Sequence, residues 1–383
     1  MILLALALAA PARGELAAAQ APTGNPQPAS PKPREGGPKL GEGGRAKPTP
    51  AETAAVERRL TDAVRQNPGS FEAHHALAGF YLQQGRLDAA IPHLEQAQTI
   101  DPSHYANGYD LALALLETGK LDRAREQVER MLGAKETAEL LNLLGDIYER
   151  ADNRVAAAEP YQRAARMDPT EEHLFDWGNN LVQLRAYDSA IEVFAAALKR
   201  HPKSGRLHVG MGIAQYSRGQ YEDAVRSFCQ AADLAPSDAR PYQFLGEMYG
   251  VVPELGGEMA KRLARFVKAQ PGNALAHFYY AMSLWKGQPA GSPPADMRPV
   301  EAHLRRAVAL DPKLAKGFLE LGILLSDQQR FKEAILQLRS AVRADPGLAQ
   351  AHYRLARAYQ RTGQEELAAK ELEIFERLKA GSR

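Results

Sequence analysis

The sequence predicts an all-α protein, built as a solenoid of antiparallel helix pairs. Three observations support this prediction. Prolines recur about every 34 residues, each after a segment with a helical pattern. A small residue occupies one fixed place in every such unit, and apolar residues recur at steps of three and four within it. Because one helix pair cannot bury its own apolar faces, the pairs are expected to stack on one another.

The spacing of the closing prolines defines the repeat. These prolines are Pro68, Pro102, Pro169, Pro202, Pro236, Pro271, Pro312 and Pro346, with successive gaps of 34, 67, 33, 34, 35, 41 and 34 residues. The gap of 67 fits two units, one of which lacks its proline. The gap of 41 contains the segment 287–299, which accommodates a loop insertion of seven residues. Proline ends a helix because it has no N–H to continue the hydrogen bonding.

Fixed positions within the unit predict how its two helices pack. When the closing proline is numbered 32, position eight is always small: Ala78, Ala112, Gly145, Gly178, Gly212, Gly246, Ala281, Gly322 and Ala356. Position 20 is mostly alanine, and position 24 carries a bulky residue such as Tyr161, Phe228 or Leu338. Glycine recurs at position 15, where it turns the chain between the two helices. Small residues let the paired helices approach closely.

The period and these positions together resemble the tetratricopeptide repeat family over some 310 residues. The resemblance implies a right-handed superhelical solenoid over 51–383, with about nine units and an N-terminal capping helix. The expected repeats are 71–104, 105–137, 138–170, 171–204, 205–238, 239–273, 274–314, 315–348 and 349–382. The sixth and seventh depart from the pattern, and they are expected to stack less regularly.

The N-terminal fifty residues differ in composition from the rest of the chain. Residues 1–19 contain an unbroken Ile, Leu and Ala run and small residues that suit cleavage after Ala19, so they are interpreted as a signal peptide. Residues 20–50 are rich in proline and glycine and are expected to form a disordered linker. The protein is therefore expected to be exported, to the periplasm or outside the cell. It would be cytoplasmic if this segment is not a signal.

Composition and motifs argue against catalysis. The chain has 48 Lys and Arg against 46 Asp and Glu, too even a balance for a nucleic-acid or membrane-surface binder. It has one cysteine, Cys229, and lacks the glycine-rich and nucleophile motifs of common enzymes. We expect no enzyme activity, no cofactor, no metal and no membrane-spanning segment. The oligomeric state is left open.

Four histidines fall on position four of different repeats. They are His74, His208, His277 and His352. No ligand pair such as His-Glu-x-x-His accompanies them, so packing between repeats is favoured over metal binding.

The family resemblance implies that the first helix of each repeat lines a concave groove for a peptide, through positions two, five, nine, 12 and 13. In repeats three and four these positions are polar: Asn142, Asp146, Glu149, Asn179 and Gln183. The C-terminal repeats offer apolar and basic candidates for partner binding: Phe278, Met282, Trp285, Ile323, Tyr353, Arg357 and Arg361. A carboxylate-clamping subset of the family is not matched, because Phe175, Gly210 and Phe244 replace three of its five polar residues.

Alternatives remain open at these candidates. The 287–299 insertion either covers the apolar residues of repeat seven or leaves them open to a ligand. The basic row of Arg354, Arg357 and Arg361 is either a solvated face paired with nearby glutamates or an anchor for acidic groups. The predicted function is a scaffold or adaptor that binds a protein or peptide. The alternatives are a regulatory or substrate-presenting subunit of an enzyme or secretion assembly, and glycan recognition.

Overall fold

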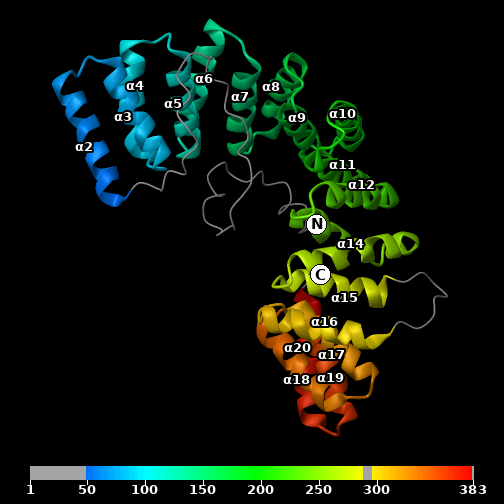
Figure 1. The fold of residues 1–383 in the computed structure, drawn as a ribbon. Coiled ribbons are helices and arrows are strands. Elements are labelled where there is room, and N and C mark those ends of the chain that lie inside the picture. The colour runs from blue at the N-terminus through cyan, green and yellow to red at the C-terminus, as the bar shows by residue number, and fades with distance from the viewer. Residues whose placement is uncertain (1–48, 288–295, 382–383) are drawn as a thin grey trace. The chain divides into compact units, whose positions relative to one another are not determined.

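The computed structural model describes residues 49–287 and 296–381, and all regular elements in these ranges are helical (Figure 1). This confirms the predicted all-α repeat solenoid. The chain divides into two compact units, which we call unit 1 (1–184) and unit 2 (185–383) and describe separately. The predicted signal peptide and almost all of the linker lie outside the described residues. None of the described helices is both long and apolar enough to cross a membrane.

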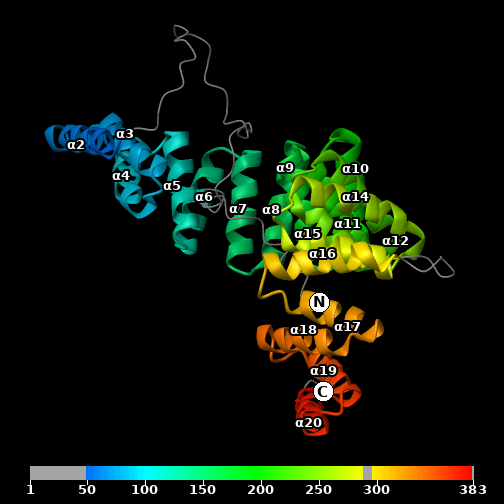
Figure 2. The same ribbon diagram turned by 60° about the horizontal axis from the view of Figure 1, so that its bottom comes forward.

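Unit 1 holds helices whose sequence neighbours pack against each other, as the two views in Figures 1 and 2 show for α5, α6 and α7. The helices are α2 (Pro50–Gln66), α3 (Phe71–Gln83), α4 (Leu87–Ile100), α5 (Tyr105–Glu117), α6 (Leu121–Ala134), α7 (Ala138–Arg150), α8 (Arg154–Met167) and α9 (Glu171–Gln183).

Unit 2 continues the helix pairs. Its helices are α10 (Tyr187–Arg200), α11 (Gly205–Arg218), α12 (Tyr221–Leu234), α13 (Ala239–Glu247), α14 (Gly256–Ala269), α15 (Ala274–Lys286), α16 (Met297–Leu310), α17 (Ala315–Asp327), α18 (Phe331–Ala344), α19 (Ala349–Arg361) and α20 (Glu365–Gly381), with a short 3₁₀ helix, η2 (Pro253–Leu255). The predicted irregularity of repeat six is visible here. Its first helix, α13, has nine residues, and η2 follows in the stretch that contains Pro253.

In seven of the helix pairs the turn between the two helices contains a residue with a left-handed backbone conformation. Glycine fills this place at Gly85, Gly119, Gly219 and Gly363, where φ lies between 69° and 88°. Because glycine has no Cβ, it adopts this conformation without strain. The same place is taken by Asp152, Arg185 and Gln329, with φ of 56° to 61°. The predicted turn glycines are therefore confirmed, and three units form the turn without one.

The small residue at position eight faces the bulky residue at position 24. A Cβ placed on Gly145 would lie 2.5 Å from the Cε1 atom of Tyr161. A Cβ on Gly212 would lie 2.7 Å from Phe228 Cε1, and one on Gly322 would lie 2.6 Å from Leu338 Cγ. Real Cβ atoms do not approach that closely, so glycine permits the ring or branched side chain to lie against the neighbouring helix. The predicted close approach of the paired helices is confirmed at these positions.

Candidate functional site

Helix α19 presents a row of arginines to solvent. Arg354, Arg357 and Arg361, which we call the arginine row, are exposed and lie on one face because they are three and four residues apart. The opposite face of α19 is buried. Within the described ranges none of the three forms an ion pair with a carboxylate; Arg357 Nη1 donates to Gln360 Oε1 at 3.3 Å. Pairing of the row with nearby glutamates is thus not observed.

An aromatic residue borders the arginine row. Tyr353 on α19 is 38% exposed, and the centre of its ring lies 5.3 Å from the centre of the Phe375 ring on α20. The Nζ atom of Lys379 lies 5.8 Å from the Phe375 ring. Tyr353 is therefore held against α20 while part of its ring remains available to a partner.

Three of the apolar candidates are buried and do not line an exposed groove. Phe278 and Met282 on α15 and Ile323 on α17 are 5%, 0% and 6% exposed, so they pack inside unit 2. Polar contacts tie the first helices of repeats six, seven and eight together: Tyr279 Oη donates to Glu247 at 3.1 Å, Lys316 Nζ lies 3.9 Å from Glu247, and Lys286 pairs with Glu320. The three residues offer no partner-binding surface in this structure.

Trp285 differs from those three residues because its side chain is only half-buried. Lys286 Nζ lies 4.8 Å from the centre of the Trp285 ring. The loop that was expected to cover or open this region lies largely outside the described residues. Trp285 therefore remains a candidate for partner contact.

The polar candidates of repeats three and four come together in unit 1. Tyr161 Oη on α8 lies 2.9 Å from Asp146 Oδ1 and 3.0 Å from Glu149 Oε2 on α7. Burial and the negative charges of Asp146, Glu149 and Asp176 raise the pKa of the Tyr161 hydroxyl above its usual range. We call these three half-buried carboxylates, which include Asp176 of α9, the carboxylate cluster. Tyr161 stays protonated beside them and donates its hydroxyl hydrogen.

Two side-chain amides border the carboxylate cluster. Asn142 on α7 is 4% exposed, and its Nδ2 atom donates to Asp176 Oδ2 at 3.1 Å. Its Oδ1 atom accepts no hydrogen bond in the described structure. An amide oxygen buried without a donor costs about 1–3 kcal/mol. Gln183 on α9 donates to Glu149. Of the predicted polar residues, Asn142, Asp146, Glu149 and Gln183 share this network, and Asn179 lies buried on α9.

The position-four histidines hold the loops between repeats. The Nε2 atoms of His74, His277 and His352 each lie 3.1 Å from a proline carbonyl oxygen six residues earlier. Their Nδ1 atoms contact His93 at 3.2 Å, His303 at 2.8 Å and Glu371 at 2.6 Å, respectively. No group of three or more His, Cys, Asp or Glu side chains suited to a metal ion occurs in the part of the chain that the structure describes. The histidines act in packing, although their proline partners were not foreseen.

The side chain of Cys229 packs in the protein interior. Cys229 on α12 is 6% exposed, and burial raises its pKa to about 11. A thiol with a raised pKa is a poor nucleophile, because the thiolate is the reactive form.

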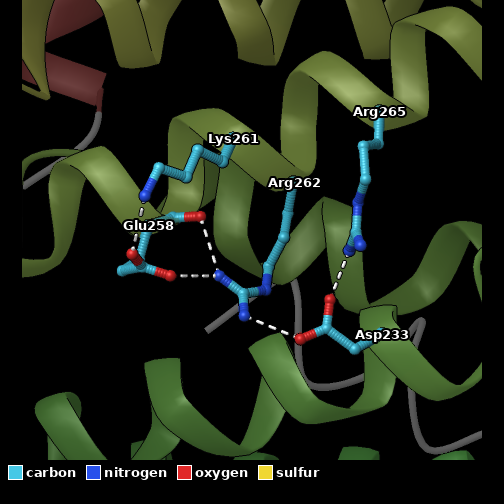
Figure 3. A pocket seen from close by; sticks show the side chains of 5 residues that line it. All are labelled: Asp233, Glu258, Lys261, Arg262 and Arg265. Carbon is cyan, nitrogen blue, oxygen red and sulfur yellow. Dashed lines mark hydrogen bonds and ion pairs between the residues drawn. The ribbon is translucent and has the colours of Figure 1, made fainter.

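A hollow of about 380 Å³ between α12 and α14 is lined by charged side chains (Figure 3). Arg262 contacts Asp233 at 2.7 Å and Glu258 at 2.6 Å, Arg265 also pairs with Asp233, and Lys261 lies 3.2 Å from Glu258. Burial lowers the pKa of Arg262, but its hydrogen bonds to Asp233 and Glu258 outweigh burial and raise it overall. All five side chains take part in these ion pairs, so the hollow is lined by a network that joins α12 to α14.

Comparison with protein families identifies repeat segments. Tetratricopeptide repeat models match residues 55–105 and 175–239 and, separately, residues 82–147. A model described as the bacterial transcriptional activator domain matches residues 258–382.

Individual relatives are similar to parts of the chain. The human protein O-mannosyl-transferase TMTC1 is 26% identical over 167 residues, which make up 42% of this chain and 19% of that protein. Human tetratricopeptide repeat protein 6 is 27% identical over 154 residues, 40% of this chain and 29% of that protein. The chain thus aligns with only a minor part of the length of these relatives.

A solved structure shares the fold. The C-terminal part of a TPR repeat-containing protein from Cytophaga hutchinsonii is 17% identical, covers 63% of this chain and 97% of its own, and superposes with a TM-score of 0.51.

Proposed function

The chain is a tetratricopeptide repeat protein, and from this premise we propose that it is a non-catalytic scaffold that binds an acidic segment of a protein partner at Tyr353 and the arginine row. Tetratricopeptide repeat proteins in general are protein–protein interaction scaffolds. The observation that carries the finer proposal is the set of exposed arginines on one face of α19 with no carboxylate partner among the described residues.

The arginine row suits acidic groups for two physical reasons. A guanidinium group stays charged at any biological pH and presents a fork of donors that matches a carboxylate. Because Arg354, Arg357 and Arg361 recur along one helix face, they can contact successive acidic side chains of one extended segment. Tyr353 adds a fixed aromatic surface beside them. Trp285 is proposed as a further contact, since its side chain is half-buried.

Charge reversal with a matched control tests this site. Binding of a fluorescent peptide with spaced glutamates is measured by anisotropy for the native chain and for Arg357→Glu/Arg361→Glu. We expect the double variant to weaken binding roughly ten-fold, which corresponds to about 1.4 kcal/mol. Arg306→Glu reverses an exposed arginine on the second helix of repeat seven and should have little effect. Equal weakening by the control would show that net charge, rather than the arginine row, determines binding.

We further propose that the protein is exported and loses residues 1–19. The support is the apolar N-terminal run followed by small residues. Mass spectrometry of the protein from its native cell should find Gln20 as the first residue. A native chain that keeps residues 1–19 would contradict export by this route.

A second candidate function is a regulatory subunit of a larger assembly. The observation that favours it is the match of residues 258–382 to the bacterial transcriptional activator domain. Because the chain carries nearly equal numbers of basic and acidic residues, we propose a protein partner rather than nucleic acid. A mobility-shift assay with duplex DNA separates these options. A shift at physiological salt would support a direct transcriptional role and contradict the scaffold proposal as stated.

A further inference from the structure

A second hollow, of about 440 Å³, lies in unit 2 between the loop before α17, α17 itself and the end of α18. We call it the basic hollow. It is lined by Pro312, Lys313, Phe318, Ser340, Arg343 and Ala344. Pockets of roughly 300–1,000 Å³ suit organic ligands, whereas a single inorganic ion needs far less space. The basic hollow therefore has the size for an organic group.

The two cations that line the basic hollow have no anionic partner. Lys313 and Arg343 are exposed, and neither forms an ion pair with a carboxylate of the described ranges. The carboxylates nearest to them along the chain, Asp311 and Asp345, do not line the hollow. They accept hydrogen bonds at 2.9 Å from the backbone N–H groups of Lys313 and Gly347. In the hollow between α12 and α14, by contrast, three cations are paired with two carboxylates. An anion bound in the basic hollow would be attracted by both cations.

Phe318 lacks a hydrogen bond that other repeats make at the same place. Position four is histidine or tyrosine in several repeats. Three of the position-four histidines contact the carbonyl oxygen of the proline six residues earlier, and Tyr242 Oη donates to that of Pro236 at 3.3 Å. Phe318 takes position four in the repeat 315–348, and a phenylalanine has no polar hydrogen. The carbonyl oxygen of Pro312 accordingly accepts no hydrogen bond from the described residues.

The remaining lining is apolar or already bonded. Phe318 and Ala344 are half-buried and give the hollow an apolar surface. The Ser340 hydroxyl donates to the Leu336 carbonyl oxygen at 3.2 Å. The basic hollow thus offers three things to a ligand: two charged donors, a backbone acceptor and an aromatic ring.

We propose that the basic hollow binds a carboxylate carried by an apolar body with an adjoining N–H, as in an N-acylated apolar amino acid. The guanidinium of Arg343 presents a fork of donors that matches a carboxylate, and Lys313 adds a second positive charge. The ligand N–H would donate to Pro312, and its apolar body would cover Phe318. A free organic acid and the last residue of a protein chain share this chemistry. The site does not include the arginine row and goes beyond the proposed function.

Two small probes test the ligand class on the full chain. N-acetylphenylalanine carries the carboxylate, and N-acetylphenylalaninamide has the same body without the charge. Isothermal titration calorimetry should give roughly ten-fold tighter binding for the acid than for the amide. Equal affinity for the two probes, or no binding of the acid, would overturn the proposal without any variant having to fold.

Charge variants locate the site. Lys313→Gln/Arg343→Gln should weaken binding of the acid roughly ten-fold. Arg306→Gln/Lys332→Gln removes two exposed cations from α16 and α18 and is the matched control, which should stay within two-fold of the native value. Circular dichroism checks that both pairs keep native helicity. Equal weakening by both pairs would overturn the proposal in favour of unspecific attraction.

Phe318→His tests the backbone acceptor. The new ring restores the donor that His352 provides in its own repeat, so it should occupy the Pro312 carbonyl and weaken binding of the acid while keeping or raising stability to urea. Phe318→Leu keeps an apolar side chain without a donor and should weaken binding less. Unchanged binding in Phe318→His would contradict the role of Pro312 and with it the proposed ligand class.

A peptide then distinguishes the two sources of the ligand. A ten-residue peptide of glycine and serine that ends in phenylalanine should bind more tightly than N-acetylphenylalanine if the natural ligand is a chain end, and no more tightly if it is a free acid. Arg357→Glu/Arg361→Glu should leave binding of the acid within two-fold of the native value. Conversely, Lys313→Gln/Arg343→Gln should leave binding of the glutamate peptide unchanged when that peptide has an amidated C-terminus. Loss of one interaction alone would contradict one proposal and leave the other standing.

Discussion

The Nε2 atom of His352 lies 3.1 Å from the backbone carbonyl oxygen of Pro346, six residues earlier. A carbonyl oxygen only accepts, so this nitrogen carries a hydrogen and donates it. The proline has just ended α18, and the histidine lies in the first turn of α19. The bond therefore fixes the loop between two repeats, and His74 and His277 repeat it at Pro68 and Pro271.

Replacing His352 by phenylalanine should destabilise the protein by about 1–3 kcal/mol, because the variant keeps a ring but leaves the Pro346 carbonyl without its donor and removes the contact with Glu371. Urea unfolding followed by circular dichroism measures this. Arg354→Ala, on the exposed face of the same helix, should change the free energy of unfolding by less than about 0.5 kcal/mol. No difference between the two variants would show that the histidine contacts add nothing to stability.

Stability should fall as the pH drops below about 6.5. Burial lowers the pKa of His93, His208 and His303 from the ordinary value of 6.5, and the facing rings of His74 and His277 lower it further at His93 and His303. The unfolded chain then binds more protons than the folded chain just below that pH. The contribution of these neutral rings to the free energy of unfolding is thus fully present above pH 6.5. It is lost as the pH falls through the lowered pKa values of the three histidines.

Thermal unfolding at a series of pH values between 5 and 8 checks this. The variant His93→Gln/His303→Gln should show a shallower loss of Tm on acidification than the native chain. A loss that is as steep in the variant would assign the pH dependence to other groups.

Periodicity was sufficient to predict the architecture. Three local features recur in register along the chain: the spacing of the prolines, the small residues at position eight and the turn glycines. Each of them has one geometric explanation. The contacts of Gly145 with Tyr161 and of Gly212 with Phe228 follow directly from them. The His352–Pro346 bond could have been foreseen too, because the spacing of six residues from proline to histidine occurs four times.

The binding surface was harder to predict, because it depends on departures from the repeat. Phe278 and Met282 occupy positions that line the groove of a regular stack. In this structure both side chains are buried in unit 2, where Glu247 also contacts Tyr279 and Lys316. An apolar side chain suits a core and a binding surface equally well, so residue type alone does not separate them. Polar residues such as Asn142 were placed correctly on a shared face, although their hydrogen bonds require the folded chain.

Gly145→Ala should destabilise the protein by about 1–3 kcal/mol, because the added Cβ would lie 2.5 Å from Tyr161 and force the ring to move. Gly79→Ala is the matched control on α3, since a Cβ there meets no atom within 4 Å. It should be neutral or stabilising by up to about 1 kcal/mol, as alanine favours the helix more than glycine does. Equal effects of the two substitutions on urea unfolding would contradict the close packing of α7 on α8.

Phe278→Ala and Trp285→Ala should separate packing from binding on α15. Phe278 is 5% exposed, so its truncation leaves a cavity and should cost about 3–5 kcal/mol of stability. Trp285 is half-buried, and its truncation should cost clearly less while weakening capture of the partner. Urea unfolding gives the first quantity for both variants, and the glutamate-peptide assay gives the second at a temperature where both are folded. If Phe278→Ala left stability unchanged yet abolished peptide binding, Phe278 would have to be exposed to the partner, and its assignment to the core of unit 2 would be wrong.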